Sequence, residues 1–156
     1  YQRMIEIGEI FSHIISNNKL HLIYLKGELG SGKTTLIRSI IRGLGYSESI
    51  PSPSFSIAEI YKINKIEVVH IDMFRIISPE SWRREEVRSY FEDEGNLIFL
   101  EWPDKASLLP KPDFMIELFW SDNSNPNGTR DVHITGNRLQ KLLEIIGPDG
   151  FIRGSG

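Results

Sequence analysis

A glycine-rich segment that carries a lysine and two threonines is the part of this sequence best suited to chemistry. Residues 27–34 read Gly-Glu-Leu-Gly-Ser-Gly-Lys-Thr, which matches the phosphate-binding pattern G-x-x-x-x-G-K-[ST]. The glycines let successive backbone N–H groups turn towards one anion, and the helix expected to follow points its positive end at the same place. Lys33 adds a charge for the β- and γ-phosphates, and the Thr34 hydroxyl is a suitable Mg²⁺ ligand. We expect the nucleotide to contact the whole loop: Gly27, Glu28, Leu29, Gly30, Ser31, Gly32, Lys33, Thr34 and Thr35.

The segments on either side of this loop have the patterns that such a loop requires. Residues 22–25 form an apolar run, Leu-Ile-Tyr-Leu, that predicts a strand. After the loop, apolar residues recur on one helical face until Gly43, a residue suited to end a helix. Because strand, loop and helix follow in the required order, the sequence predicts a nucleoside triphosphate site.

Length and composition place this site in one small domain. With 156 residues and 40% apolar content, the chain is long enough for one core, and we expect a single domain over 1–147 with a disordered tail at 148–156. The net charge of −3 argues against a general affinity for nucleic acid or anionic membranes, and the absence of cysteine excludes disulfides and thiolate metal sites. No signal or membrane-spanning pattern is present, so a soluble, cytoplasmic protein is expected.

The remaining sequence predicts an α/β domain. We expect helices at 4–15, 78–90 and 137–146 and further strands at 57–63, 66–71, 97–101, 114–120 and 130–135. The helix at 78–90 is expected to begin with Ser78 as its N-cap and Pro79 in its first turn.

Two acids follow apolar strands and are candidates to hold a metal or orient water. Asp72 ends one run and Glu101 ends another, and spacing alone does not rank them. Ser52 and Ser54, in a segment with two prolines, are candidate sensors of the γ-phosphate or of Mg²⁺. His70 could act as a general base, but a histidine inside a strand is more often a hydrogen-bonded packing residue.

Several other polar residues have simpler interpretations. Arg75 could pair with phosphate or with an acid, whereas the arginines at 83, 84 and 88 alternate with acids as on a solvated helix face, which is weak evidence for RNA contact. Residues 64–67, Asn-Lys-Ile-Glu, resemble the guanine-recognition signature of GTPases. That match fails because the last residue is Glu and the segment lies before the candidate acids, so adenine is the better prediction.

Four separated motifs together resemble one family of small bacterial ATPases. The phosphate-binding loop, residues 52–55 (Ser-Pro-Ser-Phe), residues 70–75 (His-Ile-Asp-Met-Phe-Arg) and residues 101–103 (Glu-Trp-Pro) are similar, in order, to the signatures of the TsaE (YjeE) family. The resemblance extends from about Met4 to Ile146. It implies a P-loop NTPase-like mixed β-sheet flanked by helices in three α/β/α layers. It also implies slow hydrolysis of ATP with Mg²⁺, stimulated by the TsaD and TsaB subunits that transfer threonylcarbamoyl to an adenosine of tRNA, with tRNA contacted only indirectly.

The same resemblance implies roles for particular residues. Lys33, Thr34 and Thr35 would hold the phosphates, with Thr34 and Glu101 at the metal, and Asp72 would position water. Ser54 belongs to a switch-like loop, and Trp102 falls beside the nucleotide and partner surface. The chain departs from the family pattern at four positions, where Asp, Thr, Tyr and Gly are usual: Glu28, Ser54, Phe74 and Glu86. Ser54 keeps its hydroxyl, whereas Phe74 lacks the phenol, and Glu86 puts the end of the local helix in question.

Two other functions remain open from the sequence. A small-molecule kinase can share the loop and the size, but it needs an acceptor pocket and usually a lid that bears arginine. The sequence between Glu101 and Phe114 offers only a short connection bounded by prolines. The second alternative is a nucleotide-gated interaction module in which hydrolysis serves only as a timer.

Overall fold

The computed structural model describes residues 2–17, 19–50, 57–120, 130–136 and 153–154. In this part of the chain the helices are α1 (Gln2–Asn17), α2 (Lys33–Gly43) and α3 (Glu85–Glu92), with 3-10 turns η1 (Ser81–Arg83) and η2 (Pro103–Lys105). The strands are β1 (Leu22–Gly27), β2 (Ala58–Ile63), β3 (Ile66–Asp72), β4 (Asn96–Glu101), β5 (Phe114–Trp120), β6 (Arg130–Thr135) and β7 (Arg153–Gly154). The expected helix at 137–146 and most of the expected tail lie outside the described residues.

The strands form one mixed sheet in the order β2-β3-β4-β1-β5-β6-β7. The four central strands, β3, β4, β1 and β5, run parallel, and antiparallel strands extend the sheet on both sides. The hairpins expected at 57–71 and 114–135 are confirmed by the pairing of β2 with β3 and of β5 with β6. The carboxyl ends of β1, β3 and β4 therefore meet at one edge of the sheet, where ligands bind in open α/β sheets.

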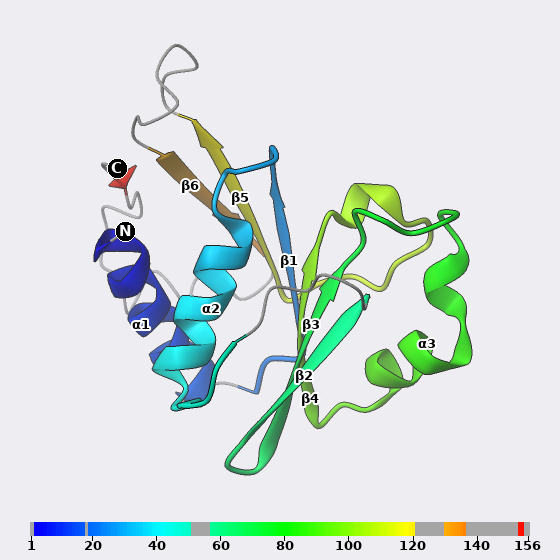
Figure 1. Ribbon diagram of the computed structural model, residues 1–156, viewed down its shortest axis with the longest axis horizontal. Helices are drawn as coiled ribbons and strands as arrows, with labels where there is room; N and C mark the ends of the chain where they lie inside the picture. The colour runs from blue at the N-terminus through cyan, green and yellow to red at the C-terminus, as the bar shows by residue number, and fades with distance from the viewer. Residues whose placement is uncertain (1, 18, 51–56, 121–129, 137–152, 155–156) are drawn as a thin grey trace.

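Helices cover both faces of the sheet, as Figure 1 shows. Helices α1 and α2 lie side by side on one face, where apolar side chains from alternate strand positions, such as Leu25 and Phe99, pack beneath Ile37 and Ile40. The opposite face carries α3 and η1, and its core includes Trp82 and Val87. The predicted α/β/α layering is thus the architecture of the described residues.

The helix predicted at 78–90 is wrong in its first half. Residues 81–83 form a 3-10 turn, Arg84 is extended with φ −56° and ψ 142°, and α3 begins only at Glu85. The buried Trp82 donates a hydrogen bond from its indole nitrogen to the carbonyl of Ser107 at 2.8 Å, which fastens the turn to the chain after β4. This tertiary contact overrides the helix-start signal of the sequence.

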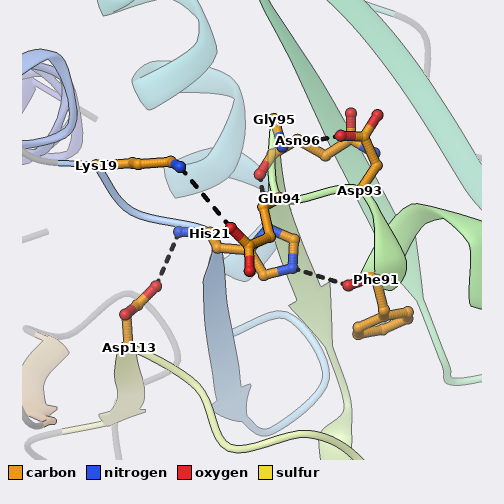
Figure 2. Close-up of polar contacts among 8 residues, drawn as sticks. All are labelled: Lys19, His21, Phe91, Asp93, Glu94, Gly95, Asn96 and Asp113. Atoms are coloured by element: carbon orange, nitrogen blue, oxygen red, sulfur yellow. Dashed lines mark hydrogen bonds and ion pairs between the residues drawn. The ribbon is translucent and has the colours of Figure 1, made fainter.

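A polar cluster holds together the amino ends of the central strands, opposite the phosphate-binding loop (Figure 2). The backbone N–H of His21, just before β1, donates to Asp113 before β5 at 2.8 Å. The two ring nitrogens of His21 face the carbonyl oxygens of Asn96 and Phe91 at 2.9 and 3.1 Å. The cluster fixes β1 against β4, β5 and the end of α3, and so helps to hold the register that places the site residues at the other edge.

None of the helices in the described ranges is both long enough and apolar enough to cross a membrane.

Candidate nucleotide-binding site

The phosphate-binding loop joins β1 to α2, as predicted, and its backbone requires glycine. Gly27, Gly30 and Gly32 have φ values of 141°, 78° and 101°, in the region that side chains disfavour. A Cβ atom on Gly27 would lie 2.3 Å from the carbonyl oxygen of Leu118 on β5. The loop can therefore approach the sheet only with glycine at this position. Glu28, Leu29 and Gly30 form its exposed tip.

Lys33, the first residue of α2, is buried with 4% of its surface exposed. Its ammonium donates hydrogen bonds to the carbonyl oxygens of Gly27 and Glu28, both at 2.8 Å, and lies 4.0 Å from the centre of the Trp102 ring. Burial lowers the pKa of Lys33, and the nearby carboxylates of Glu101 and Asp72 oppose this shift. The loop carbonyls, the aromatic ring and the two acids thus hold the cation beside the loop.

Glu101 is the acid in direct contact with the loop. Its side chain is buried, and its Oε1 accepts a hydrogen bond from the Thr34 hydroxyl at 2.7 Å. Glu101 pairs in register with Asp72 on β3 and with Leu25 on β1, so both predicted acids stand at the same edge of the sheet. Strand register brings them together, and the Thr34 contact ranks Glu101 first as the acid that acts with the threonine.

Asp72 lies beside this pair and makes a different contact. Its Oδ1 accepts a hydrogen bond from the backbone N–H of Phe74 at 2.9 Å. Burial raises the pKa of Asp72, and the charge of Glu101 raises it further against the opposing hydrogen bond and the charges of His70 and Lys33. Burial and the charge of Glu101 thus disfavour the ionised form of Asp72, and groups perturbed in this way are concentrated at functional sites.

We predict that Asp72→Asn raises the melting temperature by a few degrees near neutral pH. Because folding raises the pKa of Asp72, the folded state binds the proton more tightly, and stability falls as pH rises above the unfolded-state pKa of about 3.9. Asparagine keeps an oxygen for the Phe74 N–H and has no charge to desolvate, so the gain should vanish below about pH 4.

The matched control for this substitution is Asp93→Asn. Asp93 is exposed and accepts the same kind of bond, from Gly95 at 2.9 Å, so its replacement should leave the melting temperature nearly unchanged. Thermal unfolding of both variants across pH 4–8 checks the prediction. An equal rise in the melting temperature of Asp72→Asn at pH 4 and at pH 8 would contradict it.

His70 is a buried, hydrogen-bonded residue, as its place inside a strand predicted, but the sequence did not identify its partner. Its ring is 2% exposed, and its Nε2 lies 2.9 Å from Oε1 of Glu101, so His70 contacts the candidate site directly. The signal was present in the sequence, because His70 and Asp72 lie two residues apart on one strand and so share one face of the sheet.

Trp102 immediately follows Glu101 and adopts a left-handed backbone, with φ 59° and ψ 50°. Such a conformation costs a non-glycine residue of order 1–3 kcal/mol and is concentrated at functional sites. It places the indole over Lys33 and against the Phe74 ring, with 4.9 Å between ring centres. Phe74 thus keeps an aromatic contact without a phenol.

A groove of about 460 Å³ runs along α2 next to α1. Thr35, the last residue of the predicted loop set, lines it rather than contacting Glu101. The other lining residues are Ile5, Glu9, Arg38, Ser39, Arg42, Gly43 and Ile50. Among these lining residues, Thr35 is the one that also belongs to the predicted loop set.

Two expectations of the sequence bear on neighbouring segments. Ser52 and Ser54 lie outside the described residues. Residues 102–113, where a kinase would need a lid, contain the three-residue turn η2 and no longer helix.

The oxygen atoms near the loop suit Mg²⁺ but do not enclose it. Thr34, Glu101 and Asp72 offer hard oxygen donors, the type this ion prefers. No group of three or more histidine or acidic side chains in the described ranges could hold a metal alone. A magnesium ion here would need phosphate and water oxygens as well, which is its usual arrangement with nucleotides.

Comparison with known proteins identifies relatives of the chain. Residues 1–132 match the family model described as "Threonylcarbamoyl adenosine biosynthesis protein TsaE". The tRNA threonylcarbamoyladenosine biosynthesis protein TsaE of Haemophilus influenzae is 32% identical over 127 residues, which are 78% of each chain. The protein of the same name from Rickettsia prowazekii is 39% identical over 121 residues, 75% of this chain and 80% of its own.

A solved structure shares the fold. The crystal structure of Bacillus subtilis YdiB superposes on this chain with a TM-score of 0.62 and 23% sequence identity. The superposition covers 92% of this chain and 86% of the YdiB chain. The fold is therefore that of a known protein, and the family model spans most of the sequence, including both candidate acids. The chain belongs to the TsaE family.

Proposed function

We propose that the chain is a Mg²⁺-dependent ATPase that supports threonylcarbamoyladenosine modification of tRNA by binding and resetting the TsaD–TsaB complex. The observation that carries the ATPase assignment is the bond from Thr34 to Glu101 beside the buried ammonium of Lys33. Two of these groups come from the start of α2 and the third from the end of β4, and they converge only in the folded chain. The pathway assignment rests on the names of the relatives.

The phosphates would lie in the loop. Its N–H groups and the positive end of α2 attract the anion, and Lys33 exchanges its loop carbonyls for phosphate oxygens. The Thr34 hydroxyl can offer a lone pair to a metal while its O–H group donates a hydrogen bond to Oε1 of Glu101. Thr34 and Glu101 would hold a magnesium ion beside the phosphates, and such an ion would supply positive charge to offset the negative charge of the breaking phosphate bond. Asp72 accepts a hydrogen bond from the attacking water and orients it.

The adenosine would lie in the groove along α2. Thr35 adjoins the phosphates through the loop and also lines the groove, so a nucleotide can continue from one into the other. The volume of about 460 Å³ is within the usual range of small-molecule sites. Ile5 gives the groove an apolar wall for a base, and Arg38 gives it a cationic one.

We predict that Ile5→Trp lowers the affinity for ATP at least tenfold and leaves the affinity for tripolyphosphate unchanged. Ile5 is 40% exposed, so a larger side chain can extend into the groove without displacing the core. Tripolyphosphate needs only the loop and should bind as it does to the unsubstituted chain. Calorimetric titration with both ligands checks this, and Ile60→Trp, at a residue 43% exposed on β2, is the control. An equal loss of affinity for both ligands would contradict the placement of the adenosine in the groove.

The experiment that tests the proposed activity is phosphate release from ATP by the purified chain with Mg²⁺ and with a chelator. Slow release that requires Mg²⁺ supports the ATPase. Transfer of the γ-phosphate to a small acceptor instead of water would support the kinase alternative, and ATP binding without either reaction would support the interaction module.

A further inference from the structure

His70 and Glu101 form a buried pair behind the candidate metal-binding threonine. Their side chains are 2% and 3% exposed, and Nε2 of His70 lies 2.9 Å from Oε1 of Glu101. His70 pairs with Phe99 on β4, two residues before Glu101, so both side chains project from the face of the sheet that α2 covers. The histidine therefore lies beneath the carboxylate, on the side away from the loop tip.

Two groups lie within hydrogen-bond distance of the same carboxylate oxygen. Oε1 accepts a hydrogen bond from the Thr34 hydroxyl at 2.7 Å, and Nε2 of His70 lies 2.9 Å from it. Because a carboxylate oxygen accepts hydrogen bonds, we assign the ring proton of His70 to Nε2. Two donors from different elements, α2 and β3, fix the rotation of the carboxyl group and occupy both lone pairs of Oε1. The second oxygen of Glu101 then has a set direction.

We propose that His70 is a positioning residue for metal-dependent nucleotide binding, and the proposal rests on the function proposed above. His70 holds Glu101 so that Oε1 orients the Thr34 hydroxyl, whose lone pair would face a metal ion, and Oε2 would accept a hydrogen bond from water bound to that ion. Partners of this kind, which contact a metal site only through another residue, typically change metal affinity or activity about 10–100-fold when removed.

The test compares two substitutions that differ in one hydrogen-bond donor. His70→Gln keeps an N–H group at a similar reach, whereas His70→Leu removes it with a similar volume. His133→Leu, at an exposed histidine on β6, is the matched control. For each variant and the unsubstituted chain, ADP affinity is measured by calorimetry with Mg²⁺ and with EDTA, at a temperature at which thermal unfolding shows every protein to be folded.

We expect all four proteins to bind ADP within about threefold of one another in EDTA, because His70 contacts neither the loop nor Lys33 in the described hydrogen bonds. The gain in ADP affinity on adding Mg²⁺ should fall about tenfold or more in His70→Leu and be retained in His70→Gln and in the control. A role in stability alone would lower both affinities together. An unchanged gain in His70→Leu, or an equal loss in His70→Gln, would overturn the proposal.

Nuclear magnetic resonance separates failure of this proposal from failure of the proposed function. In the protein without nucleotide, ¹⁵N shifts of the His70 ring should report a proton on Nε2, and a ring protonated only on Nδ1 would overturn the proposal. If Mg²⁺ does not raise the ADP affinity of the unsubstituted chain, the metal part of the proposed function fails. His70 is then judged by the Thr34 resonances: a shift in His70→Leu but not in His70→Gln retains the positioning contact, and any other pattern overturns it.

Discussion

Lys33→Ala should lower ATP affinity by about 100-fold or more, the largest effect expected of any substitution in this chain. The ammonium is buried beside the loop and donates hydrogen bonds to the carbonyl oxygens of Gly27 and Glu28. Among the described residues, no other side-chain cation donates a hydrogen bond to these two carbonyls. Phosphates would then face only N–H dipoles and the end of α2, and the ammonium of Lys33 would no longer offset the nearby charges of Glu101 and Asp72.

The control for this prediction is Lys26→Ala. Lys26 stands immediately before the loop, and its ammonium pairs with Asp104 at 2.7 Å rather than with the loop. This variant loses the same charge and should bind ATP within about threefold of the unsubstituted chain, since partly exposed ion pairs contribute little. Calorimetric titration of both variants decides the matter, and micromolar affinity retained by Lys33→Ala would refute the phosphate-loop assignment.

Glu101→Gln should separate nucleotide binding from turnover. Glutamine preserves the volume of the buried side chain and can still accept the Thr34 hydroxyl, but it has no negative charge for a cation or its water. We expect ATP affinity in EDTA to change less than about threefold and the Mg²⁺-dependent hydrolysis rate to fall about 100-fold. Steady-state phosphate release at several Mg²⁺ concentrations measures this.

The outcome of this substitution also compares the two acids. If Glu101→Gln hydrolyses ATP at the normal rate and Asp72→Asn does not, then Asp72 holds the metal and the Thr34 bond is only structural. Asp72→Asn is expected to lower turnover with the Mg²⁺ dependence unchanged, because its proposed task is to orient water.

The sequence predicted the elements of the site well because their signals are local. The loop pattern, the apolar run before it and the helical face after it each depend on neighbours within a turn or a strand, and β1, the loop and α2 appear as expected. The hairpins followed from alternation and turn residues for the same reason.

What the sequence could not decide depends on contacts between distant segments. Asp72 and Glu101 look alike as acids that end strands, and only the register of β3 with β4 and the Thr34 bond distinguish them. The sequence predicted His70 as a hydrogen-bonded packing residue but could not identify its partner, which lies 31 positions away. The break at Arg84 and the strained backbone of Trp102 likewise depend on tertiary contacts that no local pattern records.

The most direct test of the proposed role is ATP hydrolysis by the purified chain, alone and with the TsaD and TsaB subunits and tRNA. The chain alone should hydrolyse ATP slowly, and adding the subunits should raise the rate strongly in the unsubstituted chain but not in Glu101→Gln. No stimulation by the subunits, together with transfer of phosphate to a small acceptor, would contradict the partner-gated ATPase and support a kinase.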